Sequence, residues 1–547
     1  MNVSNLPATH VVDRIETTRR NSDLTIHGRY EMNLASKDDI RDSDAAQTMR
    51  TFYGNLESVL KRHQPIAYAP YAAQRLAAAF ERPTMLAQIR PHHLLHSIEA
   101  NCAYTRKQNR DSVDSNRIAR IMNVYYQHRD PLHSGLCADD KLDLLFLVMY
   151  REQIELQYSY SQDELARNQE LFVSNNPMPK LSGEFLGEYG LSFDAWIRLC
   201  FFANVAATTN ESRLFHRRAL TECNFHSIPT DHVESFLQHA SLTTRQIGDR
   251  FRGVRDSTKS QFHSLIRSAF LQYPLIRLEQ DVYLAPHPPL VLRHSGQGLY
   301  NATKQLPSFG DEFGASVERY VSKLLDCASR KLRAVGNTEL EKLSPGKSCD
   351  FLVEFVDSIV LVESKATSFV AERLVENAIL NDGSTAKIAT GIEQLYTTAF
   401  DLHSGAFDCM GVDRTKPVVG IVATFGEIPF ANSGWYRDSF ILKRAESKLR
   451  TPAYPSVNMQ RWPLVVSLGT LELLLMNLNS FDFCVTALCD EKDSEPYIKT
   501  GDWDRFLASK LAGNDLRVEQ LPFVADQCDG FWRSLGIMEP PGNRGPM

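Results

Sequence analysis

Residues 309–365 decide the predicted fold, and they read FGDEFGASVERYVSKLLDCASRKLRAVGNTELEKLSPGKSCDFLVEFVDSIVLVESK. The opening part, FGDEFGASVERYVSKLLD, predicts an amphipathic helix, because its apolar residues recur every three or four positions. These residues are Phe313, Val317, Val321 and Leu324. Two later runs, SCDFLVEFV and SIVLVESK, are rich in Val, Ile, Leu and Phe and predict two strands. The stretch therefore predicts a helix followed by a β-hairpin.

Three charged side chains are expected to meet at this hairpin. A turn at Asp357 and Ser358 would place Asp350 beside Glu363 on the neighbouring strand. Because side chains alternate between the two faces of a strand, Glu363 and Lys365 should point the same way. Two carboxylates and one ammonium group would then converge.

Such a trio suits hydrolysis of a phosphodiester bond. Mg²⁺ is usually held in proteins by one or two carboxylates, together with waters and a substrate phosphate. We expect Asp350 and Glu363 to hold Mg²⁺, with Mn²⁺ as the alternative ion. A protonated Lys365 cannot bind the metal, but it can orient the attacking water and stabilise charge on the phosphate oxygens. In-line attack on phosphorus would follow.

The spacing of these residues carries a family resemblance. Asp350 is followed by twelve residues and then by Glu363-Ser364-Lys365, which resembles the motif of the PD-(D/E)XK, or restriction-endonuclease-like, nuclease superfamily. Cys349 stands where the family nominally has proline. The resemblance covers residues 301–480, and it implies an α/β domain with a mixed central sheet. It also implies a catalytic role for the two acids and the lysine.

A third acid is expected on the preceding helix. Gly314 to Glu318 is similar to the Gly-x-x-x-Glu of archaeal-type Holliday-junction resolvases. The resemblance implies that Glu318 assists catalysis and the metal, directly or through water. Glu312 is the competing candidate, and its position in the first turn favours a solvated residue stabilised by the helix dipole.

Two further residues are predicted to contact nucleic acid near the site. Gln394 resembles the glutamine of a Gln-x-x-x-Tyr motif found in some family members, although Thr398 stands at the tyrosine position. Gly346-Lys347-Ser348 resembles the end of a P-loop, but Glu341 replaces the required first glycine, which excludes an NTPase. Lys347 stays a candidate phosphate contact, with a solvated loop lysine as the alternative.

Composition narrows the class of protein. The chain has 547 residues, of which 43% are hydrophobic, and this predicts several globular domains. A net charge of −6 excludes a uniformly basic surface, so nucleic acid would bind a local basic patch. Ten cysteines without a C-x-x-C pair predict reduced thiols in a cytoplasmic protein. The sequence shows no signal-peptide pattern and no apolar run long enough for a membrane span.

The predicted fold class is multidomain, with a mainly α-helical N-terminal region and an α/β restriction-endonuclease-like C-terminal domain that has a mixed central sheet. Residues 1–240 form the helical region, for sensing, scaffolding or oligomerisation. Residues 301–480 form the nuclease domain, and residues 481–547 form C-terminal helices and a disordered tail. Within the helical region, 71–80, 141–158 and 193–208 are predicted helices, and 174–190 is a predicted loop.

The nuclease domain is expected to continue beyond the hairpin. Residues 370–403 predict a helical region interrupted at NDGSTAK, 381–387. PVVGIVATFGEIPF, 417–430, and WPLVVSLGTLELLL, 462–475, predict later strands, because long apolar runs suit buried positions of a sheet.

Residues 241–300 carry a basic segment between the two large regions. Two predicted short helices, 241–251 and 257–270, precede a predicted hairpin at 273–292, which is the order of a winged helix. Arg245 and Arg252 are candidate contacts to a DNA backbone. Arg250, Arg255 and Lys259 extend the same set. The alternative is a solvated helix face in a linking subdomain.

The sequence thus predicts a metal-dependent nuclease, with DNA favoured over RNA as the substrate. The resemblance further implies a restriction-like role in bacterial genome defence, and a homodimer or a larger defence complex stays open. A nucleic-acid-binding or scaffold protein that kept the fold and lost catalysis is the alternative. A third reading is an assembly subunit of a larger complex.

Overall fold

The structure is a computed structural model. It describes residues 9–12, 30–33, 42–81, 90–105, 113–128, 156, 162–222, 228–258, 263, 266–328, 331–344, 346–369, 383–428, 431–433, 436–442, 444, 463–476 and 521–534. The predicted helix at 141–158 lies outside these residues except for Leu156, and Lys259 lies outside them as well.

A five-stranded mixed sheet forms the centre of the C-terminal half, with the strand order β11-β10-β9-β8-β7. The hairpin prediction is confirmed, because β7, β8 and β9 pair antiparallel, whereas β9, β10 and β11 pair parallel. The strands are β7 (Lys331–Gly336), β8 (Phe351–Phe355), β9 (Ile359–Lys365), β10 (Val418–Thr424) and β11 (Leu464–Ser467). The predicted mixed sheet is therefore present, while its assignment as restriction-endonuclease-like stays a prediction.

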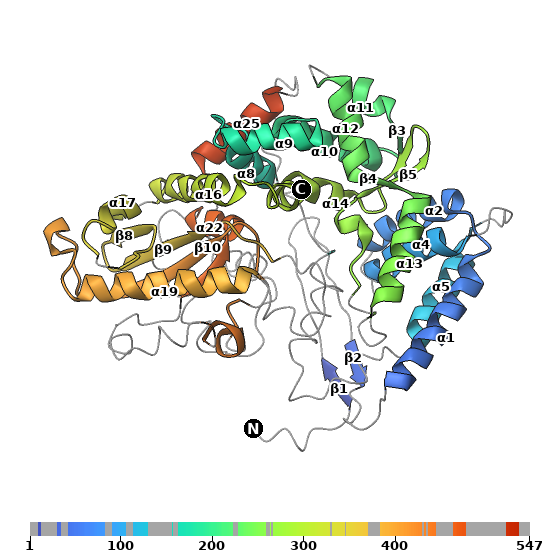
Figure 1. The fold of residues 1–547 in the computed structure, drawn as a ribbon, viewed down its shortest axis with the longest axis horizontal. Coiled ribbons are helices and arrows are strands. Elements are labelled where there is room, and N and C mark those ends of the chain that lie inside the picture. The colour runs from blue at the N-terminus through green and yellow to red at the C-terminus, as the bar shows by residue number, and fades with distance from the viewer. Residues whose placement is uncertain are drawn as a thin grey trace.

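Helices cover both faces of this sheet (Figure 1). Helix α16 (Phe309–Asp326) packs on one face, and helix α19 (Gly383–His403) packs on the other. Alternation along β9 explains the two layers, since Val362 joins the core under α16 and Leu361 joins the core under α19. The predicted stripe of α16 is confirmed, because all four of its apolar residues are fully buried.

The rest of the chain is mainly helical, as predicted. The remaining helices are α1 (Asp42–Leu60), α2 (Pro65–Glu81), α4 (Pro91–Tyr104), α5 (Ser115–Gln127), α8 (Gln162–Phe172), α9 (Pro179–Tyr189), α10 (Phe193–Thr208), α11 (Arg218–Glu222), α12 (Thr230–Ala240), α13 (Thr244–Ser257), α14 (Pro288–Arg293), α15 (Leu299–Thr303), α17 (Asn337–Leu340), α22 (Leu468–Leu475) and α25 (Pro522–Ser534). Short 3₁₀ turns lie at Ala269–Leu271 and Asp408–Met410, and π-helical turns lie at His294–Gly298 and Arg437–Ile441. Helices α2 and α10 confirm the predictions for 71–80 and 193–208.

A second, four-stranded sheet lies in the middle of the chain, with the order β3-β6-β5-β4. Its strands are β3 (Leu214–His216), β4 (Ser241–Thr243), β5 (Leu275–Glu279) and β6 (Val282–Leu284). The hairpin predicted at 273–292 is confirmed by β5 and β6 as far as Leu284, but it is wrong from Pro288 onward, where α14 begins. Helix α13 is the first of the two predicted helices, although 241–243 form β4 instead. Of the second predicted helix, residues 259–262, 264 and 265 lie outside the described residues. The prediction is wrong at 266–268, which are not helical, and 269–270 lie in a 3₁₀ turn. A separate two-stranded sheet pairs β1 (Thr9–Val12) with β2 (Tyr30–Asn33).

One hydrophobic cluster connects the helical region with the central sheet. It runs from Leu165 on α8, through the core under α16, to Phe531 on α25. A buried ion pair strengthens this connection, because the Arg167 guanidinium donates to both carboxylate oxygens of Glu472 at 2.6 and 2.8 Å. The hydroxyl of Tyr320 donates to the same carboxylate. The cluster crosses residues 240 and 300, and the division into domains at those positions stays a prediction.

The predicted loop at 174–190 is wrong for most of its length, since α9 begins at Pro179. Proline at the first turn and a left-handed Gly190 at the end, with φ 69°, are typical helix boundaries. The carboxylate of Glu312 accepts from the backbone N–H groups of Lys180 and Leu181, at 3.3 and 2.8 Å. The hydrogen-bond acceptor for the first N–H groups of α9 is therefore a side chain of α16, which is distant in the sequence.

Two other predictions need correction. The run 462–475 is a strand only at Leu464–Ser467, after which α22 begins with Ser467 as its N-cap. The side chain of Ser467 accepts from the N–H of Thr470, which ends the strand and starts the helix. The predicted interruption at 381–387 is also wrong from Gly383 onward, because α19 starts there.

The described ranges contain no helix that is both long enough and apolar enough to span a membrane. Six cysteines in these ranges are not joined in disulfide bonds: Cys102, Cys200, Cys327, Cys349, Cys409 and Cys528.

Candidate functional site

The ends of β8 and β9 bring the two predicted acids together. The antiparallel register pairs Phe351 with Val362, so the next position beyond the ladder places Asp350 opposite Glu363. Both residues are buried, with 8% and 1% of their surface exposed. The structure therefore brings together the pair that the hairpin prediction had placed side by side.

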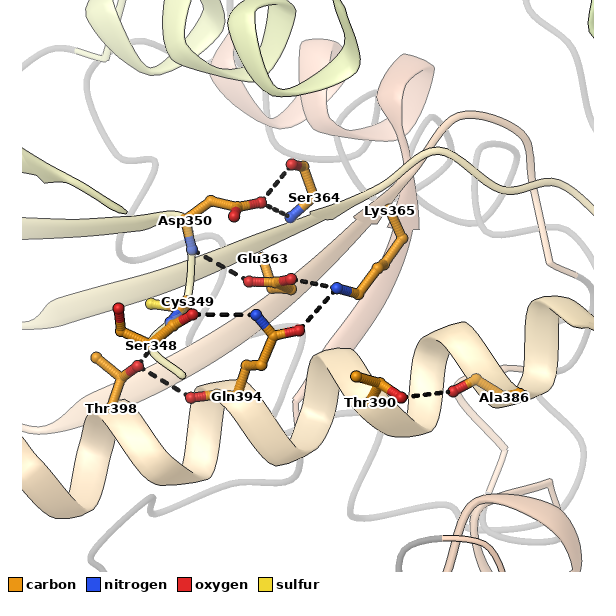
Figure 2. A network of polar contacts seen from close by, with 10 residues as sticks. All are labelled: Ser348, Cys349, Asp350, Glu363, Ser364, Lys365, Ala386, Thr390, Gln394 and Thr398. Atoms are coloured by element: carbon orange, nitrogen blue, oxygen red, sulfur yellow. Dashed lines mark hydrogen bonds and ion pairs between the residues drawn. The ribbon is translucent and has the colours of Figure 1, made fainter. Parts of the chain in front are cut away.

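Each carboxylate accepts a hydrogen bond from the backbone beside the other (Figure 2). The N–H of Asp350 donates to Oε2 of Glu363 at 3.1 Å, and the N–H of Ser364 donates to Oδ2 of Asp350 at 2.7 Å. The hydroxyl of Ser364 also donates to Oδ2 of Asp350. These bonds hold the two strand ends together beyond the regular ladder.

Lys365 points to the same side of β9 as Glu363, as strand alternation requires. Its ammonium group donates to Oε1 of Glu363 and to Oε1 of Gln394, the latter at 2.8 Å. The side chain of Lys365 is 15% exposed, whereas that of Glu363 is 2% exposed. Lys365 is therefore more accessible to solvent than the acid with which it pairs.

Burial dominates the electrostatics of this group. The pKa of Glu363 is raised to about 8, most strongly by burial and then by the nearby Asp350 carboxylate, while Lys365 opposes the rise. Two neighbouring carboxylates in a poorly solvated position repel each other when both are ionised. A divalent cation would relieve that repulsion.

Glu318 lies on α16, across from the strand ends, and is partly buried. Its pKa is raised first by burial, then by the charges of Asp350 and Glu341. Glu318 is therefore within electrostatic range of Asp350. The competing candidate, Glu312, caps α9 instead of lying in solvent as expected.

Asp350 and Glu363 are the residues that would hold a divalent cation here. Within the described residues, no group of three or more His, Cys, Asp or Glu side chains is gathered closely enough to hold a metal ion. Asp350, Glu363 and Glu318 thus do not form a three-ligand group. A pair of carboxylates completed by waters and a phosphate is a usual Mg²⁺ shell, and Asp350 and Glu363 would be that pair. The Asp350 carboxylate accepts from Ser364, whose side chain points to the other side of β9 from Glu363 and Lys365.

Gln394 is placed by α19 against the site but is 4% exposed. Its Nε2 donates to the carbonyl of Ser348 at 3.0 Å, while its Oε1 accepts from Lys365. A surface contact to nucleic acid was predicted for this residue, whereas its observed partners belong to the protein. Lys347, one residue before Ser348, is exposed beside the same loop.

The arginines of α13 lie elsewhere in the molecule (Figure 1). Arg245 is 91% exposed and lies 3.8 Å from Asp249. Arg252 is paired with Asp249 at 2.6 Å and also donates to the carbonyl of Ala103, which ties α13 to α4. The structure does not bring either arginine to the carboxylate site, and Arg252 is partly used in helix packing.

Several site residues were missed by sequence reasoning. Ser364 was noted only as the middle residue of Glu-x-Lys, and Thr398 only as a departure from the Gln-x-x-x-Tyr pattern. Gly391 lies where α19 passes closest to β9, since a Cβ there would lie 3.2 Å from Cε of Lys365 and 3.3 Å from Cγ of Glu363. The glycine at position 391, one turn before Gln394, was the sequence feature that could have indicated this close packing.

No family model, no curated protein and no solved structure matches this chain.

Proposed function

We propose that the chain is a metal-dependent nuclease that hydrolyses phosphodiester bonds, with DNA favoured as the substrate. The observation that carries this proposal is the cluster of Asp350, Glu363 and Lys365 at adjoining strand ends, joined by hydrogen bonds and largely buried. A buried carboxylate pair is unfavourable by itself, which is consistent with a site shaped for a cation.

Each side chain has a defined task in this proposal. Asp350 and Glu363 would hold Mg²⁺ or Mn²⁺, with Glu318 assisting from α16 directly or through water. The bound ion supplies a water of lowered pKa and neutralises charge on the phosphate. Lys365 uses N–H donors on Glu363 and Gln394, and its third can orient the attacking water or contact a phosphate oxygen.

Two exposed cations are the proposed contacts to the nucleic-acid backbone. Lys347 lies in the loop that leads into β8, next to the carboxylates, and is the nearer one. Arg245 on α13 would contact a more distant part of a long substrate. Contacts of this kind position the backbone without reading its sequence.

The direct test is incubation of the purified protein with linear, circular and single-stranded DNA and with RNA. Each substrate is offered with Mg²⁺, Mn²⁺ or EDTA. We expect cleavage with either cation, none with EDTA, and none by Asp350→Ala. Asp413→Ala, which changes an exposed aspartate away from the site, is the control that should keep full activity.

A second candidate function is nucleic-acid binding without catalysis. The specific observation in its favour is that the three predicted acids do not form a three-ligand group in the structure. This candidate predicts DNA binding that does not require a divalent cation and is unchanged by Lys365→Ala. Binding without cleavage in the test above would select it.

A further inference from the structure

Helix α19 carries a hydrogen-bonded chain that runs beneath the carboxylate site (Figure 2). Gln394 and Thr398 lie one turn apart on the buried side of the helix, with 4% and 0% of their surface exposed. The hydroxyl of Thr398 donates to the carbonyl of Gln394 at 2.9 Å. The same hydroxyl accepts the N–H of Cys349 at 2.8 Å.

This chain reaches both halves of the site. The N–H of Cys349 belongs to the residue immediately before Asp350, and the carbonyl of Ser348 accepts from Nε2 of Gln394 at 3.0 Å. The remaining amide atom of Gln394, Oε1, accepts from Lys365. One helix therefore fixes the peptide that leads into Asp350 and the ammonium group of Lys365.

The orientation of the Gln394 amide is determined by these partners. Its Nε2 faces a carbonyl and its Oε1 faces an ammonium group, so a flipped amide would set two donors against each other. Likewise, the Cys349 N–H is fully buried, and the Thr398 hydroxyl gives it an acceptor. Neither bond can be exchanged for water without opening the packing of α19 against the sheet.

Helix α19 packs closely against the sheet, which brings Gln394 and Thr398 within hydrogen-bonding distance of their partners. A Cβ at Gly391 would lie 3.2–3.3 Å from Lys365, Glu363 and Val422, so a larger residue there would require these side chains to shift by a few tenths of an ångström. Gln394 follows one turn later on the same side of the helix. Gly391, Gln394 and Thr398 therefore all lie on the side of α19 that packs against the sheet.

We propose that Thr398 is a positioning residue, which with Gln394 sets the Cys349–Asp350 peptide and the Lys365 ammonium group for catalysis. This inference rests on the proposed nuclease function and deepens it. Thr398 touches neither the acids nor the ammonium group itself. It acts through the Cys349 N–H on one side and through the Gln394 carbonyl on the other.

The test compares Thr398→Val, which keeps the side-chain shape and removes the hydroxyl, with Thr398→Ser, which restores it. Thr390→Val is the matched control, because Thr390 is exposed on the same helix and its hydroxyl donates to the carbonyl of Ala386 at 3.1 Å. Two quantities are measured: amide hydrogen exchange at Cys349 in metal-free protein, and kcat and KM for DNA cleavage with Mg²⁺.

We expect Thr398→Val to speed exchange at Cys349 and to lower kcat roughly 10- to 100-fold at unchanged KM. Thr398→Ser should restore both, and Thr390→Val should change neither. If Thr398→Val does not fold, Gln394→Met, which removes the bonds to Ser348 and Lys365, takes its place with the same expected loss in kcat.

The outcomes separate this inference from the proposed function. Wild-type protein that cleaves DNA, together with a Thr398→Val variant indistinguishable from Thr390→Val, would overturn the positioning role alone. Wild-type protein that cleaves nothing would overturn the nuclease proposal. In that case the exchange rate at Cys349 still decides whether Thr398 holds the peptide, and an unchanged rate would reject the inference.

Discussion

The raised pKa of Glu363 predicts how the stability of the metal-free protein depends on pH. The folded state holds this proton until about pH 8, whereas the unfolded chain releases it near its ordinary pKa of 4.5. The free energy of unfolding should therefore fall as the pH rises between these values and level off above pH 8. A difference of about 3.5 between the two pKa values, at about 1.4 kcal/mol for each unit, gives roughly 5 kcal/mol.

The assay is denaturant unfolding in EDTA at intervals from pH 5 to pH 9, with Glu363→Gln measured beside the wild type. Titrating groups that do not contact Glu363 affect both proteins alike and cancel in the difference. The wild type should lose several kcal/mol relative to the variant across this range. Saturating Mg²⁺ should flatten the wild-type curve, because the cation stabilises the ionised carboxylate. Parallel curves for the two proteins in EDTA would refute the reasoning about Glu363.

Three further substitutions test one contact at the site and two contacts elsewhere in the fold. Gly391→Ala should lower the cleavage rate, because its new Cβ would lie 3.2 Å from Cε of Lys365 and displace that side chain; a variant with normal activity would contradict the reasoning that Lys365 is held in place by this packing. Glu312→Ala should cost about 1 kcal/mol in denaturant unfolding, through loss of the acceptor at the start of α9, and leave cleavage unchanged. Arg167→Met should cost about 3–5 kcal/mol, since it leaves Glu472 buried without its partner, and a cost below about 1 kcal/mol would argue against that pair.

Local patterns were sufficient to predict the hairpin. The runs around Asp350 and Glu363 are apolar, short and separated by a tight turn, so their antiparallel pairing and its register follow from neighbouring residues. The stripe of α16 was equally readable from its spacing. Strand alternation also fixed the side to which Lys365 points.

Long-range contacts account for what was missed. The start of α9 was read as a loop because its backbone N–H acceptor, Glu312, lies 131 positions away in the chain. The change from strand to helix at Ser467 was missed because a continuous apolar run fits both structures, and only the cap separates them. The bond from Cys349 to Thr398 spans 49 positions and has no pattern in the sequence.

The nuclease account is tested most directly by the rate of Mg²⁺-dependent DNA cleavage in Lys365→Ala, compared with Lys416→Ala. Lys416 pairs with the buried Glu354 at 2.7 Å, and its side chain is 14% exposed, compared with 15% for Lys365, but it belongs to a different ion pair of the same sheet. We predict that Lys416→Ala cleaves at close to the wild-type rate and that Lys365→Ala is slower by about 100-fold or more. Equal rates for the two variants, or no cleavage by the wild type, would contradict the account.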